Sequence, residues 1–343
     1  QLMNTMRAAV ADGIGEALHL RELPVPEPGA GQVLVRLAAS GICHTDLSIL
    51  DGEWQMKKPR FPLVPGHEAA GHVAACGDGV TSIKEGDRAG IFWLNSACGT
   101  CVDCMNGREP FCLRQINPGY TADGTYAEYC LVSADYAVPL PEGPIELLAP
   151  IMCAGVTVYK ALKELALPPG SWLVISGVGG AGHLAIQYAR LLGLNVAAID
   201  VDAEKVALAE QLGATFTINA EREFPVNKIV RETGGGAHAV MITTGAIKAF
   251  EQGIRMLRRC GICMLVGVPR EPFPVTVFDV VIKGVQVRGS LIGTRDDVRE
   301  AVELVSEGKV KPQVETRPLN EVNEAITALR QGRIKGRVVL TMN

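Results

Sequence analysis

The sequence predicts an α/β protein with two domains, the first rich in β strands and the second built on a doubly wound parallel sheet. A length of 343 residues suits about two domains. Up to roughly Pro150 the chain is rich in glycine and proline and has short alternating segments such as residues 32–37, which is typical of a barrel-like β domain. From Cys153 to about Arg288, strand-like and helix-like runs alternate, which is typical of a parallel sheet.

The alternation can be followed element by element through the middle of the chain. The expected strands cover residues 171–176, 195–200, 215–219, 238–243 and 261–268. The expected helices cover residues 181–192, 203–212 and 246–257. A further helix over 295–307 and a closing strand over 337–341 follow. We therefore divide the chain into segments 1–152, 153–288 and 289–343.

A glycine-rich turn joins the first of these strands to the first helix. Gly177, Gly179 and Gly182, with Gly180 between them, form the pattern G-x-G-x-x-G. The first glycine permits the turn, the second admits a pyrophosphate, and the third lets helix and strand approach each other. Strand, glycines and helix in this order predict a dinucleotide site, and a glycine-rich turn without a ligand is the alternative.

The next strand ends in Asp200, about twenty residues beyond the glycines. A carboxylate there accepts hydrogen bonds from the adenosine ribose and repels a 2′-phosphate, and no arginine follows immediately, so NAD is favoured over NADP. Lys205 lies five positions on. It either assists at the ribose or belongs to a solvated helix face.

Four cysteines lie close together in a lobe over residues 95–113. Cys98, Cys101, Cys104 and Cys112 have the spacing C-x2-C-x2-C-x7-C, which predicts a closed structural zinc site. Disulfides are the alternative, but a chain of this length does not need disulfide cross-links for its stability. An iron–sulfur cluster is disfavoured because the spacing differs from the ferredoxin run and Leu113, not proline, follows the last cysteine.

A second set of metal-binding residues is spread along the first half of the chain. Cys43, His67 and Cys153 provide two thiolates and one imidazole, which leaves the fourth position of a zinc ion open, as in catalytic sites. A lone buried cysteine or histidine more often fills the core than binds a metal. The prediction therefore depends on their joint occurrence.

The residues around His67 carry a family resemblance. Gly66-His67-Glu68, followed by Gly71, Gly77 and Val80, matches the zinc signature G-H-E-x2-G-x5-G-x2-V at every fixed position. From about Met6 to its C-terminus the chain resembles the zinc-containing medium-chain alcohol dehydrogenases, of the microbial ethanol type. The resemblance implies a GroES-like catalytic domain, a Rossmann cofactor domain, a C-terminal segment that returns to the catalytic domain, and an active site in the cleft between the two.

The resemblance also implies an activity and roles for individual residues. The expected reaction is reversible, NAD-linked oxidation of short primary alcohols to aldehydes, by hydride transfer from a zinc-bound alkoxide in an enzyme with two zinc ions per chain. Thr45 is expected to take the alcohol proton and His44 to lie beside the pyrophosphate. Asp46 and Glu68 are the expected carboxylates behind the metal. Ser48 stands where many relatives have histidine, and serine passes a proton but cannot store one near neutrality.

Further contacts follow from the same resemblance. Trp54 and Trp93 are expected to line and narrow the substrate site. Thr157 is expected to pack on the nicotinamide with Val268 beside it, and Arg337 to bind the pyrophosphate. The remaining cysteines are expected to stay reduced and structural, and they are Cys76, Cys130, Cys260 and Cys263.

Composition excludes several other classes of protein. The net charge is −4 and no long basic block occurs, so we expect no nucleic-acid partner. No apolar run approaches the ~20 residues of a membrane helix, and the N-terminus lacks a signal-peptide core, so a cytoplasmic enzyme is expected. Microbial members of the family suggest a homotetramer, with a strand near 285–290 extending a sheet between subunits. Two rival interpretations stay open, a zinc dehydrogenase for polyols, formaldehyde adducts or cinnamyl-type alcohols, and a nonenzymatic NAD sensor.

Overall fold

The computed structural model describes residues 4–54 and 56–342. The chain forms two compact units. The first contains Gln1–Val156, Ile292–Gly308 and Pro312–Asn343, and the second contains Thr157–Leu291 and Lys309–Lys311. The C-terminal part of the chain therefore returns to the first unit at Ile292, and only Lys309–Lys311 belong to the second unit after that point.

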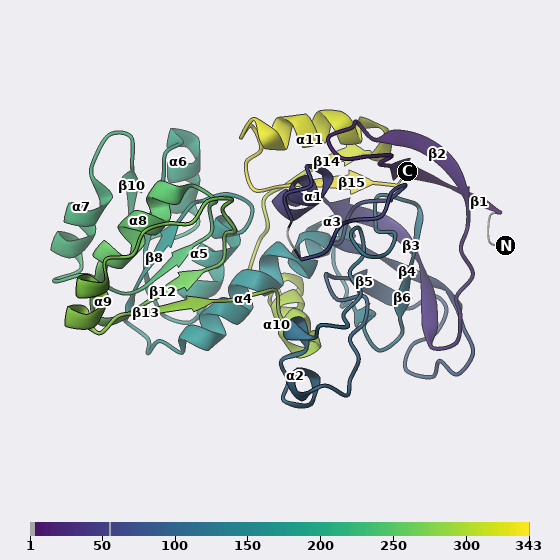
Figure 1. Ribbon diagram of the computed structural model, residues 1–343, viewed down its shortest axis with the longest axis horizontal. Helices are drawn as coiled ribbons and strands as arrows, with labels where there is room; N and C mark the ends of the chain where they lie inside the picture. Colours follow the sequence, from purple (N-terminus) through teal and green to yellow (C-terminus); the bar gives the residue numbers. More distant parts are fainter. Residues whose placement is uncertain (1–3, 55, 343) are drawn as a thin grey trace. The chain divides into compact units, whose positions relative to one another are not determined.

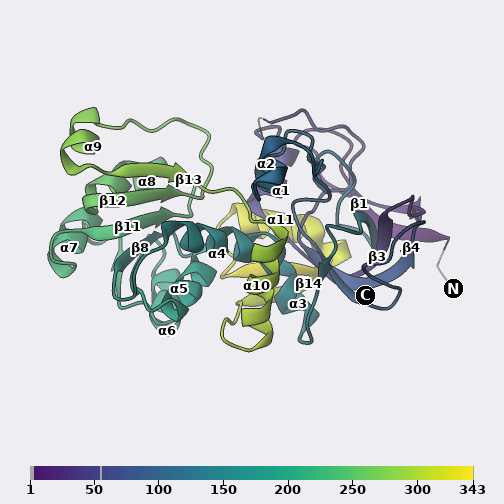
Figure 2. The same cartoon turned by 90° about the horizontal axis from the view of Figure 1, so that it is seen from below.

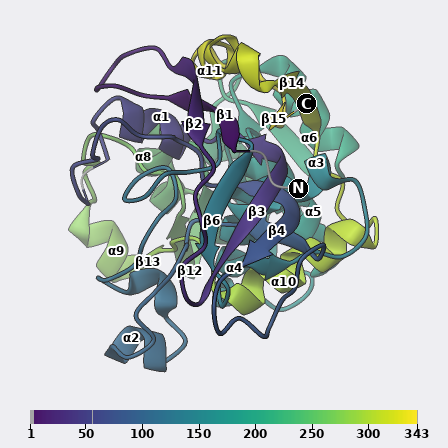
Figure 3. The same ribbon diagram turned by 90° about the vertical axis from the view of Figure 1, so that its right-hand side faces the viewer.

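The first unit is built on a seven-stranded sheet with the order β14-β15-β3-β4-β5-β7, in which β6 also pairs with β3. Figure 3 shows β3, β4 and β6 side by side. In the same unit, β1 and β2 form a separate antiparallel pair. The bounds are β1 (Thr5–Val10), β2 (His19–Pro24), β3 (Gln32–Gly41), β4 (Ala69–Cys76), β5 (Arg88–Ile91), β6 (Tyr129–Ser133), β7 (Val138–Pro139), β14 (Val314–Pro318) and β15 (Arg337–Thr341).

Short helices connect these strands, and α11 packs on β14 and β15 (Figure 1). The helix that opens the returning segment, α10, begins with a capping box in which Thr294 and Asp297 satisfy each other's backbone N–H groups. The bounds are α1 (His44–Leu50), α2 (Val102–Met105), η1 (Glu109–Phe111), α3 (Ile145–Leu148), η2 (Ala149–Met152), α10 (Arg295–Ser306), η3 (Leu319–Glu321) and α11 (Val322–Arg330). Helix α4 (Ala154–Leu165) begins in the first unit, but most of it belongs to the second, which starts at Thr157.

The second unit is a six-stranded sheet with the order β10-β9-β8-β11-β12-β13, and every strand pair is parallel. Helices α5 and α6 lie on one face and α9 on the other (Figure 2). The strand order reverses at β8, and ligands of doubly wound sheets bind at such a switch point. The bounds are β8 (Trp172–Ser176), α5 (Gly182–Leu191), β9 (Asn195–Asp200), α6 (Ala203–Gln211), β10 (Phe216–Asn219), α7 (Pro225–Glu232), β11 (Ala237–Ile242), α8 (Ile247–Arg255), β12 (Leu257–Leu265), α9 (Val277–Lys283) and β13 (Gln286–Gly289).

The core of the second unit explains why its strands are recognisable in the sequence. Val174, Ala197, Ile218 and Val240 come from four neighbouring strands and are all buried in one cluster. Parallel strands covered on both faces are nearly continuous apolar runs. Their positions agree with the expected ones to within about two residues, except at β12.

Strand β12 begins at Leu257, four residues earlier than the expected start at Gly261. Cys260 has a φ of 60°, and the pairing with β11 shifts register between Ala237 and Ala239. This irregularity interrupts the apolar pattern, so the first part of the strand resembles the end of the preceding helix.

Among the described residues, no single helix has the length and apolar character needed to cross a membrane. One bent pair of helical segments, Ile145–Met152 with Ala154–Leu165, meets the length and composition criteria when the two are taken together.

Candidate metal centres and dinucleotide site

The fold brings Cys43, His67 and Cys153 together in the first unit. Cys43 is the residue before α1, His67 precedes β4, and Cys153 separates η2 from α4. Cys43 Sγ lies 3.8 Å from Cys153 Sγ, and His67 Nε2 lies 3.1 Å from Cys153 Sγ. These donor atoms and a carboxylate oxygen of Glu68 all lie within 4.8 Å of one another.

These distances fit a tetrahedral zinc ion. Two sulfurs about 2.3 Å from such an ion lie about 3.8 Å apart, and an imidazole nitrogen about 2.0 Å from it lies somewhat closer to each sulfur. The two thiols share a hydrogen bond, which holds the pKa of Cys43 well below its usual range and raises that of Cys153. Three such donors hold one cation and leave its fourth position open.

Asp46 lies directly behind the histidine and is completely buried. Its Oδ1 accepts a hydrogen bond from His67 Nδ1 at 2.6 Å, which leaves Nε2 to face the cysteines. Burial lowers the pKa of His67, but the charge and hydrogen bond of Asp46, together with those of Cys43, outweigh it, so the net pKa lies well above its usual value. The expected partnership of Asp46 with His67 is thus present in the geometry.

Tyr126 is a member of this network that sequence reasoning missed. Its hydroxyl donates to Asp46 Oδ2 at 2.8 Å, and the backbone N–H of Cys43 donates to the same oxygen at 3.0 Å. Tyr126 is fully buried and lies 80 positions from Asp46. A single tyrosine in a β-rich segment carries no local signal of such a role.

Glu68 is also completely buried, and its Oε1 accepts a charged hydrogen bond from Arg337 Nη2. Its Oε2 is buried without a hydrogen-bond partner in the structure. Burial raises the pKa of Glu68 to about 7, although the charge of Arg337 opposes this. The positive charge of a cation held by the two thiols and the imidazole would stabilise this buried, unpartnered carboxylate oxygen.

Arg337 thus has a partner that the sequence did not reveal. Its side chain is 5% exposed and bonded to Glu68, and its Nε has no partner in the structure. The expected contact of Arg337 with a pyrophosphate stays a prediction.

The two predicted tryptophans lie next to the metal ligands. The rings of Trp54 and Trp93 meet edge to face with centroids 5.9 Å apart. Trp93 meets the His67 ring at 5.1 Å in the same manner and stacks on Tyr120 at 6.0 Å. Both indole Nε1 atoms are buried without a hydrogen-bond partner in the structure.

Helix α1 carries the three residues expected to move the proton or contact the cofactor. His44 and Thr45 form its first turn directly after the ligand Cys43, and Ser48 follows one turn later. His44 is exposed, whereas Thr45 and Ser48 are half-buried. The helix therefore positions these side chains relative to the metal ligands, and their roles stay predictions.

The glycines of the zinc signature are explained by close packing. Gly66 has a φ of +95°, and an added Cβ would collide with the Tyr126 ring. A Cβ at Gly71 would meet the carbonyl oxygen of Arg36 on the neighbouring strand, and one at Gly77 would meet the carbonyl of Gly29. These positions admit no side chain where the signature segment folds against the sheet.

The four lobe cysteines converge as their spacing predicted. All four Sγ atoms lie within 4.8 Å of one another, and the separation of Cys98 from Cys104 is 3.9 Å. Backbone N–H groups point at the sulfurs, from Cys98 to Cys112 at 3.4 Å and from Cys101 to Cys98 at 3.3 Å. Hydrogen bonds led by the Thr100 N–H lower the pKa of Cys98 to about 5, which favours a thiolate.

In the second unit the glycine-rich turn has the geometry that a dinucleotide needs. Gly177 has a φ of +101°, and an added Cβ at Gly182 would collide with the Gly177 carbonyl oxygen. A Cβ at Gly179 would meet nothing within 4 Å, so this face of the turn is open for close approach. Asp200 steadies the turn by accepting the Val178 N–H at 2.7 Å.

The other predicted cofactor residues are distributed around the same unit. Lys205 lies in the first turn of α6, where its backbone N–H donates to Asp202. Thr157 is half-buried in α4. Val268 follows β12 and is 67% exposed. Their contacts with a dinucleotide stay predictions.

Comparison with known proteins agrees with this geometry. Residues 29–142 match the family model described as "Alcohol dehydrogenase GroES-like domain", and residues 180–307 match "Zinc-binding dehydrogenase". An alcohol dehydrogenase of Moraxella sp. (strain TAE123) is 47% identical over 336 residues, which cover 98% of this chain and 99% of the relative. The chain belongs to the zinc-binding alcohol dehydrogenase family.

Other members of this alcohol dehydrogenase family show the same full-length similarity. An alcohol dehydrogenase of Geobacillus stearothermophilus is 47% identical over 339 residues, covering 98% of this chain and 100% of the relative. The crystal structure of the alcohol dehydrogenase from Aeropyrum pernix superposes with a TM-score of 0.92 at 32% identity, covering 98% and 99% of the two chains. The expected GroES-like and Rossmann domains are thereby confirmed.

Proposed function

We propose that this family member is a zinc-dependent alcohol dehydrogenase that oxidises short primary alcohols reversibly with NAD. The observation that carries the proposal is the convergence of Cys43, His67 and Cys153 on one point, with Asp46 fixing the imidazole. Three protein ligands with an open fourth position are the arrangement of catalytic zinc, whereas a structural ion takes four.

Residues of the first unit have separate roles in the proposed reaction. When bound, zinc supplies a Lewis acid at the alcohol oxygen and NAD supplies the hydride acceptor. Cys43, His67 and Cys153 would hold the metal, and Asp46 keeps His67 in the tautomer that presents Nε2. The Thr45 hydroxyl takes the alcohol proton, and Ser48 passes it to water because its hydroxyl both donates and accepts.

A second zinc per chain is proposed for the four-cysteine lobe. Its sulfurs lie within 4.8 Å of one another and offer four thiolates, which close the coordination sphere. Such a site contributes to folding and not to turnover.

NAD is proposed as the nucleotide because of Asp200. Its two carboxylate oxygens accept backbone N–H groups of Val178 at 2.7 Å and Asp202 at 3.0 Å, which holds the charge at the end of β9. A 2′-phosphate placed there would be repelled, while a ribose hydroxyl can donate to the same oxygens.

A limit to short alcohols is proposed because Trp54 and Trp93 crowd the metal ligands. The Trp93 ring lies 5.1 Å from that of His67, and Trp54 packs against Trp93. Each additional methylene that finds no room reduces kcat/KM by about tenfold or more.

The proposal is tested by counting metal and measuring turnover of the purified protein. We expect two zinc ions per chain and a kcat/KM with NAD that is highest for ethanol to butanol and falls for branched and aromatic alcohols. We expect turnover with NADP to be at least about tenfold lower, which corresponds to about 1.4 kcal/mol of repulsion between Asp200 and the 2′-phosphate. A preference for polyols or cinnamyl-type alcohols would favour the other zinc dehydrogenases. One zinc and no turnover with any alcohol would favour an NAD-binding sensor.

A homotetramer is proposed as the assembly, with α9 and β13 as one contact. Val277, Phe278 and Val281 on α9 are 72%, 70% and 68% exposed, and β13 is the outer strand of its sheet with all residues exposed. An unpaired edge beside apolar side chains suits pairing with a second copy. Light scattering should give the mass of four chains, and Phe278→Glu should reduce it. A wild-type mass of one chain would contradict the assembly.

A further inference from the structure

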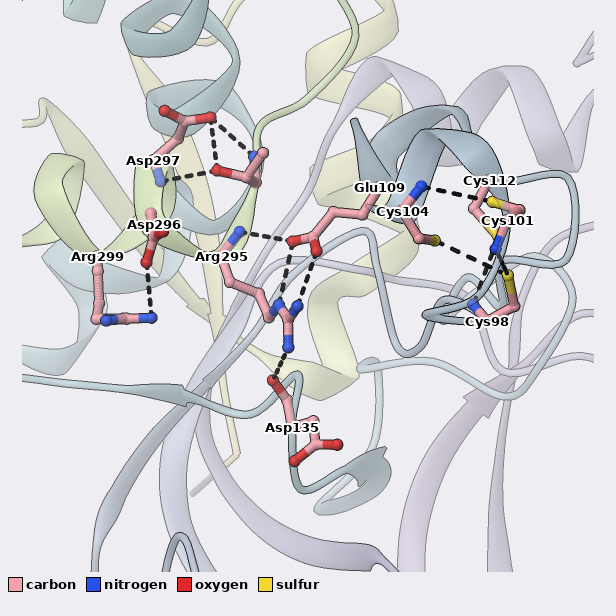
Figure 4. Close-up of polar contacts among 11 residues, drawn as sticks. Cys98, Cys101, Cys104, Glu109, Cys112, Asp135, Arg295, Asp296, Asp297 and Arg299 are labelled. Carbon is pink, nitrogen blue, oxygen red and sulfur yellow. Dashed lines mark hydrogen bonds and ion pairs between the residues drawn. The ribbon is translucent and has the colours of Figure 1, made fainter. Parts of the chain in front are cut away.

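An ion pair between the buried Glu109 and the half-exposed Arg295 attaches the four-cysteine lobe to a part of the first unit that is distant in sequence (Figure 4). Glu109, between the third and fourth cysteines, is 5% exposed. Its Oε2 accepts a hydrogen bond from Arg295 Nη2 at 2.9 Å, and its Oε1 accepts from Arg295 Nε at 3.2 Å. The backbone N–H of Arg295 also donates to Oε1 at 2.9 Å. One carboxylate thus accepts three hydrogen bonds from a residue 186 positions away.

Arg295 is itself held firmly. It is the first residue of α10, whose start is fixed by the capping box of Thr294 and Asp297. Its Nη1 donates to the Asp135 carbonyl at 3.3 Å, and its guanidinium lies 4.5 Å from the centre of the Tyr136 ring. A carboxylate at the N-terminus of a helix is further stabilised by the helix dipole. Glu109 therefore binds to a half-exposed side chain that the Asp135 carbonyl and the Tyr136 ring also hold in place.

Glu109 is connected in turn to a cysteine of the lobe. It begins the single turn η1, and its carbonyl oxygen accepts the backbone N–H of Cys112 at 3.0 Å. Cys112 is 1% exposed, and its Sγ accepts the backbone N–H of Cys98 at 3.4 Å. Gln115 Nε2 donates to the carbonyl of Cys112 from the other side at 2.9 Å. The position of Glu109 therefore determines where the Cys112 sulfur lies.

Apolar packing contributes little to holding α2, and Pro110 and Cys112 are the lobe's buried apolar residues among those described. Val102, Met105 and Leu113 are 66%, 74% and 90% exposed, and helix α2 has no buried residue. In Figures 1 and 3, α2 lies at the edge of its unit, away from the strands. The charged contact with α10 is thus a principal attachment of the segment that carries Cys112.

We propose that Arg295 is a positioning residue for the four-cysteine metal site. By binding Glu109, it holds the η1 turn so that Cys112 completes the set of four thiolates, and the retention of metal there depends on it. The inference goes beyond the proposed function, because it concerns the stability of the lobe and would hold whatever substrate the enzyme takes.

The test compares two variants of helix α10 in the zinc-loaded, full-length protein. Arg295→Gln removes the charged contact with Glu109. Arg299→Gln is the matched control, because among the ion pairs described Arg299 pairs only with the exposed Asp296, at 2.9 Å (Figure 4). The rate of alkylation by iodoacetamide is measured for every cysteine by peptide mass spectrometry, together with zinc release to a chelator.

We expect Arg295→Gln to speed alkylation of the lobe cysteines by about tenfold or more, which is the usual effect of losing a residue that supports a metal ligand. One equivalent of zinc should leave at a matching rate. Cys43 and Cys153 should react as in the wild type, and so should the buried Cys130 and Cys263, which report on general unfolding. Arg299→Gln should change none of these rates.

A double-mutant cycle with Glu109→Gln identifies the partner. If the two residues act through each other, the double variant should release zinc no faster than the faster single variant. Arg295→Lys keeps the charge but not the planar fork and should give an intermediate rate, which also serves if Arg295→Gln folds poorly. The proposal is overturned if the lobe cysteines react at the wild-type rate, if all ten cysteines become reactive together, or if Arg299→Gln has the same effect.

Discussion

Replacing Cys153 by serine is expected to remove one zinc ion per chain and to reduce kcat by about 10³-fold or more. Cys153 Sγ lies 3.8 Å from Cys43 Sγ and 3.1 Å from His67 Nε2, so it stands at the centre of the donor set. A metal Lewis acid contributes several kcal/mol to transition-state stabilisation, and each 1.4 kcal/mol or so is a factor of ten in rate. Zinc content by mass spectrometry and ethanol turnover with NAD measure the two effects.

The control for this substitution is Cys76→Ser. Cys76 is a half-buried cysteine at the end of β4, whose thiol faces the Ile83 carbonyl and not the donor set. This variant should keep both zinc ions and full activity. Two zinc ions and wild-type turnover in Cys153→Ser would show that the donor set is not the catalytic metal site.

Replacing Asp46 by asparagine is expected to weaken zinc binding at the same site by about 10–100-fold, the usual effect of losing the carboxylate partner of a ligand histidine. Asp46 accepts hydrogen bonds from His67, Tyr126 and the Cys43 N–H. The asparagine amide has an NH2 group in place of one carboxylate oxygen, so this group would face one of the three donors that now bind Asp46. The imidazole of His67 then loses its fixed tautomer and orientation. Zinc dissociation rates measured with a chelator test this.

Two companion variants show whether the effect follows this hydrogen-bond network. Tyr126→Phe removes one donor to Asp46 and should speed zinc dissociation by less than Asp46→Asn does, in the same direction. Asp123→Asn changes an exposed carboxylate that accepts only the Val64 N–H among the hydrogen bonds described, and it should have no effect. Equal rates in all three variants and the wild type would rule out a role for Asp46 in holding His67.

The four-cysteine lobe, the segment around His67 and the glycine-rich turn were predictable because their signals are local, whereas Cys43 and Cys153 lie 110 positions apart and were assigned by their joint occurrence with these motifs. The spacing from Cys98 to Cys112 and the segment Gly66-His67-Glu68 are each contained within fifteen residues or fewer. The glycine turn beginning at Gly177 is equally short, and its strand and helix neighbours have clear apolar patterns. In each case the backbone geometry that the chemistry needs is encoded by adjacent residues.

The supporting residues were not predictable, because each acts through a contact that spans a long stretch of chain. Tyr126 lies 80 positions from Asp46, and Arg337 lies 269 positions from Glu68. No pattern of neighbours distinguishes these side chains from ordinary buried ones. Arg337 is an example. The resemblance predicted that it contacts the pyrophosphate, but nothing in the sequence indicated that its guanidinium also pairs with the carboxylate of Glu68.

The amino-acid sequence by itself determined the family, the four-cysteine set and the glycine-rich turn, since closely spaced residues of suitable chemistry impose them, and the tertiary structure brought Cys43, His67 and Cys153 together across 110 positions. Only the tertiary structure decided which side chains support the residues around those ligands. Tyr126 donates a hydrogen bond to Asp46, Arg337 to Glu68 and Arg295 to Glu109. The physical reason is that a hydrogen bond depends on the distance between two atoms in space, as when the pairing of β15 and β4 with β3 brings Arg337 to Glu68. Position along the chain does not reveal that distance.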